Sequence, residues 1–204
     1  MLIQHDDDEL YQGYLAKVYH GTSAKANYTA AHFSTEQVKR ICLTYGEMHY
    51  FGVKKVCRAM QLTSQDKFLD LGSGLGKFAL QVFMQAPVDN VLGIEAATSL
   101  YEQSQQVKLN VQQELGFLWE DRRQLTYLCD NFLTADWQAA TAVYTCSTCF
   151  TQDLLIAIGD RLNQEKQVRV VASLRPLPTL QRLRLKTIFA VECTWDTTLC
   201  YVYV

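Results

Sequence analysis

Residues 68–77 read Phe-Leu-Asp-Leu-Gly-Ser-Gly-Leu-Gly-Lys, with three glycines in five positions directly after a short apolar run. Each glycine loses more backbone freedom on folding than any other residue, so this density is expected where the backbone must come close to a ligand. The run at residues 68–71 is typical of a buried parallel strand. A helix should follow from residue 75 to residue 85 and end near Pro87. The stretch is therefore a candidate ligand-binding loop between a strand and a helix.

Strands and helices continue to alternate after this stretch, and two β-rich runs close enough to form a hairpin end the chain. Ser99 and Glu102 form a capping box at the start of the first of two further helices. Because strands that alternate with helices indicate an α/β fold, we predict a Rossmann-like, mostly parallel seven-stranded sheet with a C-terminal antiparallel hairpin. The remaining predicted strands are residues 90–95, 126–129, 142–146, 167–174, 187–194 and 198–204, and the helices are residues 99–116 and 151–162.

The first part of the chain has a different pattern. Residues 1–62 are helix-like and mixed in polarity, and several glycines interrupt them. Ser34 and Gln37 form a capping box before one helical pattern, and a second helix is predicted at residues 49–60. We therefore divide the chain into a small N-terminal helical segment, 1–62, and a ligand-binding domain, 63–204.

Composition and charge argue against several classes of protein. A net charge of -2 over 204 residues gives no sign of a broad nucleic-acid-binding surface or of a polybasic membrane patch. Seven scattered cysteines do not form a disulfide framework and fit a reducing compartment. The N-terminal sequence is acidic where a signal peptide would be basic, and no apolar run approaches the ~20 residues of a membrane span. We expect a soluble cytoplasmic protein.

Two familiar glycine-loop patterns do not fit residues 68–77. A P-loop has four residues between its glycines and a hydroxyl after the lysine, but three residues separate Gly72 from Gly76 and Phe78 follows Lys77. The dinucleotide fingerprint fails because its third glycine arrives one residue early. What remains is Asp70-x-Gly72-x-Gly74-x-Gly76.

This pattern resembles motif I of the class I S-adenosylmethionine (SAM) methyltransferases. Glycine backbone can approach the ligand closely, and an acceptor near Asp70 can receive its ammonium group. Glu95 ends the next predicted strand, where a carboxylate can accept hydrogen bonds from both ribose hydroxyls. The alternative is that the glycines only form a tight turn and that Glu95 is a solvated charge at the end of a strand. The combination of glycine loop, following helix and correctly placed acid favours a nucleoside cofactor.

A closer resemblance extends over roughly residues 33–155. The chain has Tyr45-Gly46-Glu47 before the glycine loop, Gly93-Ile94-Glu95 after it, and Asn131-Phe132-Leu133-Thr134-Ala135-Asp136-Trp137 further on. This order resembles the catalytic core of the non-SET histone lysine methyltransferases of the disruptor of telomeric silencing family. The resemblance implies a class I methyltransferase fold, SAM as cofactor with S-adenosylhomocysteine as product, and a protein substrate as partner.

The resemblance also implies roles for individual residues. Glu47 would help to hold the amino-acid end of the cofactor, Glu95 would bind the ribose, and Phe132 would flank the adenine. The family has aspartate where this chain has Asn131, so either the Asn131 carbonyl or Asp130 would meet the adenine amino group. The cofactor-binding set is then Glu47, Asp70, Gly72, Ser73, Gly74, Gly76, Glu95, Asp130, Asn131 and Phe132.

The chain departs from the family at the end of the fourth predicted strand. The family has an Asn-Asn-Phe-x-Phe segment there, whereas this chain reads Cys146-Ser147-Thr148-Cys149-Phe150. The candidate catalytic residues are Tyr45, Ser147 and Phe150, with Phe150 as a wall of the acceptor channel. Cys146 and Cys149 have metal-ligand spacing, but no matching second pair accompanies them, so we predict packing cysteines and no metal site.

The function expected from these features is SAM-dependent methyl transfer to a nitrogen nucleophile, a protein lysine side chain. The altered segment at 146–150 keeps a second hypothesis open, namely a SAM-binding interaction module without catalytic activity. A methyltransferase acting on a small molecule is a further alternative.

Overall fold

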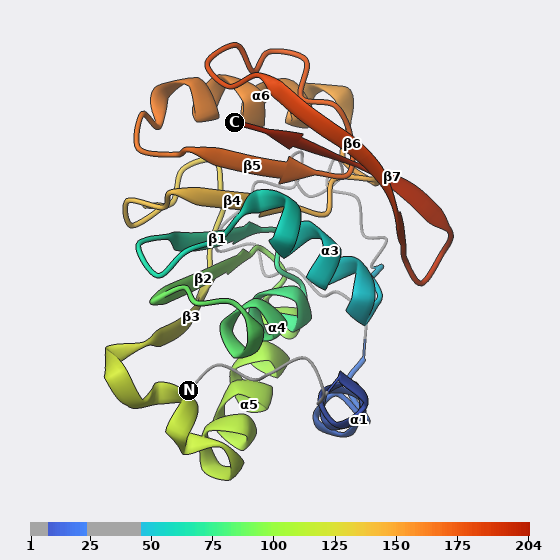
Figure 1. Cartoon of the computed structure of the whole chain (residues 1–204), viewed down its shortest axis with the longest axis vertical. Coiled ribbons are helices and arrows are strands. Elements are labelled where there is room, and N and C mark those ends of the chain that lie inside the picture. The colour runs from blue at the N-terminus through green and yellow to red at the C-terminus, as the bar shows by residue number, and fades with distance from the viewer. Residues whose placement is uncertain (1–7, 24–45) are drawn as a thin grey trace.

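Seven strands form one sheet in the computed structural model, which describes residues 8–23 and 46–204. Their order is β3-β2-β1-β4-β5-β7-β6, and Figure 1 follows them from β3 at the bottom of the view to the β6–β7 hairpin at the top. β1 to β5 pair in parallel, whereas β7 pairs antiparallel with both β5 and β6. The strands are β1 (Lys67–Leu71), β2 (Asn90–Glu95), β3 (Gln124–Cys129), β4 (Ala142–Thr145), β5 (Val170–Ser173), β6 (Leu185–Glu192) and β7 (Thr197–Tyr203). The predicted mostly parallel seven-stranded sheet with its antiparallel hairpin is confirmed.

Helices cover both faces of the sheet. They are α1 (Asp8–Val18), α3 (Tyr50–Met60), α4 (Lys77–Gln85), α5 (Thr98–Glu114), the 3-10 helix η2 (Gly116–Arg122) and α6 (Gln152–Gln164). One buried apolar cluster joins α1, α3, α4 and α5 to the strands, and a second joins α6 and the segment after β3 to the opposite face. Neighbouring residues of β1 divide between the clusters, since Phe68 belongs to the first and Leu69 to the second.

The described part of the N-terminal segment packs on the sheet domain. α3 buries Val53 and Val56 in the first apolar cluster, and Met48 forms an isolated antiparallel bridge with Cys193 after β6. The predicted helix at residues 49–60 is therefore confirmed, with its start at Tyr50. The capping box of Ser34 and Gln37 lies outside the described residues.

Two predicted helix starts are wrong by a few residues. α4 begins at Lys77 and not at residue 75, because Gly74 and Gly76 have φ of 56° and 77° and keep the chain in a turn. α5 begins at Thr98 with Ala97 as its N-cap, and no side chain caps it. Ser99, the predicted N-cap, is therefore the second residue of the helix.

No helix in the described ranges is both long enough and apolar enough to span a membrane.

An ion pair between the buried Asp66 carboxylate and the more exposed Arg169 ties the start of β1 to the start of β5. Asp66 is 2% exposed, and its carboxylate accepts hydrogen bonds from the Arg169 guanidinium, from the Thr63 backbone amide at 2.7 Å and from the Thr141 hydroxyl at 2.8 Å. Burial alone would raise the pKa of Asp66, but these hydrogen bonds outweigh it and hold the pKa at about 2. The carboxylate is therefore ionised at neutral pH.

We expect Asp66→Ala to lower the free energy of unfolding by about 2 kcal/mol at neutral pH, because partly buried donors lose their acceptor. The pKa of Asp66 is lower in the folded chain than its ordinary value of 3.8, so its contribution is complete above about pH 4 and declines toward about pH 2. Urea denaturation at several pH values measures this. The exposed control Asp160→Ala should stay within about 0.5 kcal/mol of wild type, and an equal loss in both variants would contradict the prediction.

Candidate active site

The glycine loop sits at the carboxyl end of β1 and is tied to β2. Gly72, Gly74 and Gly76 all have positive φ, a region that other residues rarely adopt. The backbone amides of Gly72 and Ser73 donate to the Ile94 carbonyl at 2.9 and 3.1 Å. A Cβ at Gly76 would lie 2.5 Å from the Tyr127 ring, so both the conformation and the space require glycine there.

Glu95 holds the loop from the end of β2. One oxygen of its carboxylate accepts from the Gly74 amide and the other from the Ala97 amide, each at 2.7 Å. Each carboxylate oxygen can accept a further hydrogen bond. Glu95 is 7% exposed. Its two hydrogen bonds fix the loop, and its remaining lone pairs can accept from a ligand at the edge where the sequence predicts a ribose.

Two buried acids, Asp70 and Glu95, lie close enough for the charge of Glu95 to affect the pKa of Asp70. Burial, together with the negative charge of Glu95, raises the pKa of Asp70 to about 8, although the Ala79 amide opposes the shift. Burial also raises the pKa of Glu95, against the hydrogen bonds from Ala97 and Gly74. Within residues 8–23 and 46–204 neither carboxylate belongs to an ion pair. A ligand that brings positive charge fits this site.

The loop also contains a buried hydroxyl. Ser73 is 8% exposed, and its Oγ has no hydrogen-bond partner in the part of the chain that the structure describes. The hydroxyl lies over β2, because a Cβ at Gly93 would be 2.8 Å from the Ser73 Oγ. Ser73 thus adds an available polar atom to the two carboxylates.

Two aromatic rings converge on the same loop. The centroids of Phe132 and Phe150 are 5.9 Å apart, with 28° between the ring planes. A Cβ at Gly72 would lie 3.3 Å from Cζ of Phe150 and 3.9 Å from Cε1 of Phe132. The structure therefore brings a predicted adenine neighbour and a predicted acceptor-channel wall together over the first glycine.

The segment that carries Phe132 is held by its own polar groups. Asn131 Oδ1 accepts from the Leu133 amide at 2.9 Å, and Asp130 Oδ1 accepts from the Asn131 amide at 2.6 Å. The Trp137 indole donates to the Phe132 carbonyl at 2.8 Å. Asn131 and Asp130 therefore shape the turn, and each acceptor oxygen keeps a second lone pair.

Glu47 reaches the far side of the glycine loop. Its carboxylate pairs with Lys77, the first residue of α4, at 2.7 Å, and its backbone carbonyl accepts from the Thr194 amide at 2.8 Å. Lys77 Nζ also lies 5.4 Å from the centroid of the Tyr19 ring. Glu47 thus stands beside the loop, whereas Tyr45 lies outside the described residues.

Ser147 is a structural neighbour of the site. It is fully buried, its hydroxyl lies 2.7 Å from that of Ser173, and it accepts from the Arg175 amide at 3.0 Å. The Arg175 guanidinium donates to the Phe150 carbonyl. Ser147 and Arg175 together fix the segment that presents Phe150.

The cysteines beside the site are free thiols. Burial raises the pKa of Cys146 to about 12, and its Sγ lies 3.9 Å from the Gly46 carbonyl oxygen. Across the described ranges no three His, Cys, Asp or Glu side chains come together as a metal site would require.

Sequence reasoning missed two residues that organise this site. Lys77 directly follows the last loop glycine, and weighing its charge could have suggested an acidic partner upstream. Arg175 belongs to no motif, and the contact with Phe150 depends on how β5 ends. No sequence signal points to it.

Comparisons with known proteins agree with this geometry. The sequence model of one protein family, described as "Histone methylation protein DOT1", matches residues 28–190. A curated Drosophila melanogaster protein, "Histone-lysine N-methyltransferase, H3 lysine-79 specific", is 30% identical over 83 residues, which is 41% of this chain and 4% of that protein. The chain thus spans only a small fraction of that relative.

Solved structures share the fold. An RNA methyltransferase from Salinibacter ruber, in complex with S-adenosyl-L-homocysteine, has a TM-score of 0.52 and 16% identity over 76% of this chain and 90% of that chain. The methyltransferase domain of bacterial CtHen1-CN has a TM-score of 0.57 and 11% identity over 74% of this chain and 96% of that chain. At such low identity these similarities show the fold, which is the predicted class I methyltransferase fold.

The raised pKa of Asp70 generates a stability prediction. Because this pKa is about 8 in the folded chain and ordinarily 3.8, the folded state binds more protons in that interval, and stability falls as pH rises through it. Asp70→Asn removes the charge while its amide oxygen can still accept from Ala79. We expect the variant to melt at least about 3 °C above wild type near pH 8, with the difference vanishing toward about pH 4.

Thermal melts followed by circular dichroism over this pH range make the measurement. The exposed control Asp89→Asn should track wild type. A pH-independent difference, or none near pH 8, would show that Asp70 does not titrate as described.

Proposed function

The chain belongs to the DOT1 histone methylation family of SAM-dependent methyltransferases, and we propose that it transfers the methyl group to a nitrogen nucleophile, the side chain of a protein lysine. The observation that carries the proposal is the pair of rings, Phe132 and Phe150, lying over Gly72 beside two buried carboxylates. The carboxylates suit a cationic nucleoside cofactor, and the apolar rings favour the neutral form of an amine acceptor beside it.

The residues at the carboxyl edge of the sheet fit SAM. Glu95 would accept from the ribose hydroxyls, and Gly72, Ser73, Gly74 and Gly76 would let the backbone approach the ligand. Asp70 and Glu47 would face its amino-acid end, and Phe132 would flank the adenine, with Asp130 or Asn131 at its amino group. When bound, SAM supplies a methyl group that its sulfonium already activates, so the protein's main task is alignment.

The acceptor sets a second requirement. A lysine amine has an ordinary pKa near ~10.4 and must lose its proton before it can attack. An apolar wall favours the neutral amine, because desolvation disfavours the charged form. Phe150 supplies such a wall, and Ser147 and Arg175 act as positioning residues through the backbone that carries it.

The choice of a protein lysine draws support from the family match and from the Drosophila melanogaster relative, whose name specifies a histone lysine. Because the match covers only 4% of that relative, the substrate in the relative's name cannot be assigned to this chain from the match alone. A small-molecule acceptor and a SAM-binding module without catalysis are the competing outcomes. A cytoplasmic location stays a prediction from the sequence.

The cofactor assignment predicts how SAM affinity responds to Glu95→Ala. We expect wild type to bind SAM and S-adenosylhomocysteine, and the variant to lose at least about tenfold in affinity, because one carboxylate both holds the loop and meets the ribose. Isothermal titration measures it. Glu102→Ala, an exposed acid on α5, should bind as wild type does. Unchanged affinity in a folded Glu95→Ala protein would refute the site.

The acceptor assignment predicts a loss of turnover in Phe150→Ala. We expect kcat for methyl transfer to core histones to fall about 100-fold, because a misplaced acceptor loses its alignment, while the Kd for SAM changes by less than about threefold. Phe150→Tyr, which keeps the ring, should retain most activity. Radiolabelled methyl transfer followed by amino-acid analysis of the product tests this.

The same assay separates the competing functions. Label in methyllysine supports the proposal. Label confined to small molecules of a cell extract would favour the small-molecule enzyme, and tight SAM binding without transfer to any acceptor would favour the interaction module.

A further inference from the structure

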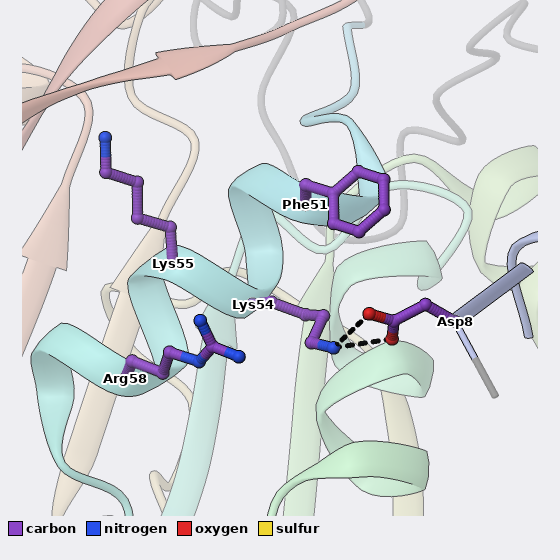
Figure 2. Close-up of a pocket in the computed structure, with 5 residues that line it drawn as sticks. All are labelled: Asp8, Phe51, Lys54, Lys55 and Arg58. Carbon is purple, nitrogen blue, oxygen red and sulfur yellow. Dashed lines mark hydrogen bonds and ion pairs between the residues drawn. The ribbon is translucent and has the colours of Figure 1, made fainter. Parts of the chain in front are cut away.

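The helix α3 carries a basic hollow on its outer side. Val53 and Val56 face the core, whereas Phe51, Lys54, Lys55 and Arg58 line a hollow of about 460 Å³ together with Asp8 of α1. Figure 2 shows Lys54 and Arg58 extending toward the side of Asp8, whereas Lys55 points the other way.

The charges in this hollow are unevenly distributed. The α3 sequence contains three basic residues and no acidic one, so among the described residues the only carboxylate of the lining comes from another element. Asp8 supplies it, and both of its oxygens accept from Lys54, one of them at 2.6 Å. The described lining is therefore net positive in a chain whose net charge is -2.

The hollow also offers an apolar surface that is held in place. Phe51 is 60% exposed, and its ring packs edge-on against Tyr50, with centroids 5.2 Å apart. Lys55 donates to the Ala190 carbonyl at 2.9 Å and lies 5.0 Å from the Phe189 ring centroid, which fixes its stem along β6. A ligand here meets positive charge and an aromatic ring together.

We propose that this hollow is a docking site for an acidic segment of a partner protein, in which carboxylates pair with Lys54, Lys55 and Arg58 and an apolar side chain packs on Phe51. Asp8 shows how a carboxylate is bound there, by two contacts to one ammonium group. The site goes beyond methyl transfer, since none of its residues belongs to the candidate active site.

Charge complementarity favours an acidic peptide over a nucleic acid. Nucleic-acid affinity comes from many phosphate contacts along a basic track, and a chain with a net charge of -2 and a pI near 6.1 provides no wider positive field. Three cations around one exposed ring suit a short segment of acidic and apolar residues.

Asp8 acts as an internal competitor in this arrangement. Its carboxylate occupies Lys54, and the Tyr50 hydroxyl also donates to it at 2.9 Å. Asp8→Asn removes the charge while leaving an amide oxygen for Tyr50. Lys54 then becomes available, and affinity for an acidic segment should rise.

The test is fluorescence anisotropy of the full chain with a labelled peptide of glutamate and leucine, and with labelled single-stranded RNA and duplex DNA as separate probes. We expect the peptide to bind, Arg58→Glu to weaken it at least about tenfold, or about 1.4 kcal/mol, and Asp8→Asn to tighten it. Lys166→Glu, the same charge change at an exposed residue beyond α6, should leave affinity within about twofold.

Each other outcome overturns the proposal. Binding of RNA or DNA but not of the peptide, with the same sensitivity to Arg58→Glu, would make the hollow a nucleic-acid site. Equal losses in Arg58→Glu and Lys166→Glu would show a general charge effect, and no binding by any probe would show that the hollow docks neither ligand.

Discussion

The parallel pairing of β1 with β2 is the constraint on which the rest of the site depends. In this register Asp70 lies opposite Gly93, so the ends of the two strands bring Asp70 and Glu95 to one edge of the sheet. On the other side β1 pairs with β4, so the strand order reverses direction at β1. Open α/β sheets bind ligands at such a switch point, outside the carboxyl ends of the strands. Loop, acids and rings all gather there.

The same pairing explains why one carboxylate has two roles. The loop is fastened to β2 by amides that donate to Ile94 and Glu95, and the three glycines provide the positive φ values that aim those amides. Glu95 also accepts from Ala97, at the start of α5. An acid at this position therefore shapes the loop before any ligand arrives. A fixed loop lowers the entropy lost on binding, which is how preorganisation raises affinity.

The fold could be predicted where local pattern decides it. Buried parallel strands such as β1 and β2 are short apolar runs, and these runs can be recognised in the sequence itself. The insertion of β7 between β5 and β6 left no local pattern, because strand order depends on tertiary packing. The start of α5 was mispredicted since Glu95, from outside the helix, already accepts from Ala97. The site residues came from motifs, whereas Arg175 acts through a contact that only the folded chain creates.

Burial of Asp70 and Glu95 links folding to binding. Removing two acids from water disfavours their charged forms, and the negative charge of Glu95 further raises the energetic cost of ionising Asp70. Lys77, the cation that directly follows the glycine loop, is paired with Glu47. A positive ligand at the loop stabilises both carboxylates where water cannot. The two buried carboxylates thus destabilise the protein in the neutral pH range, and the same two groups give a cationic cofactor a higher affinity for their ionised state. Binding of such a cofactor should therefore favour release of the proton that Asp70 holds.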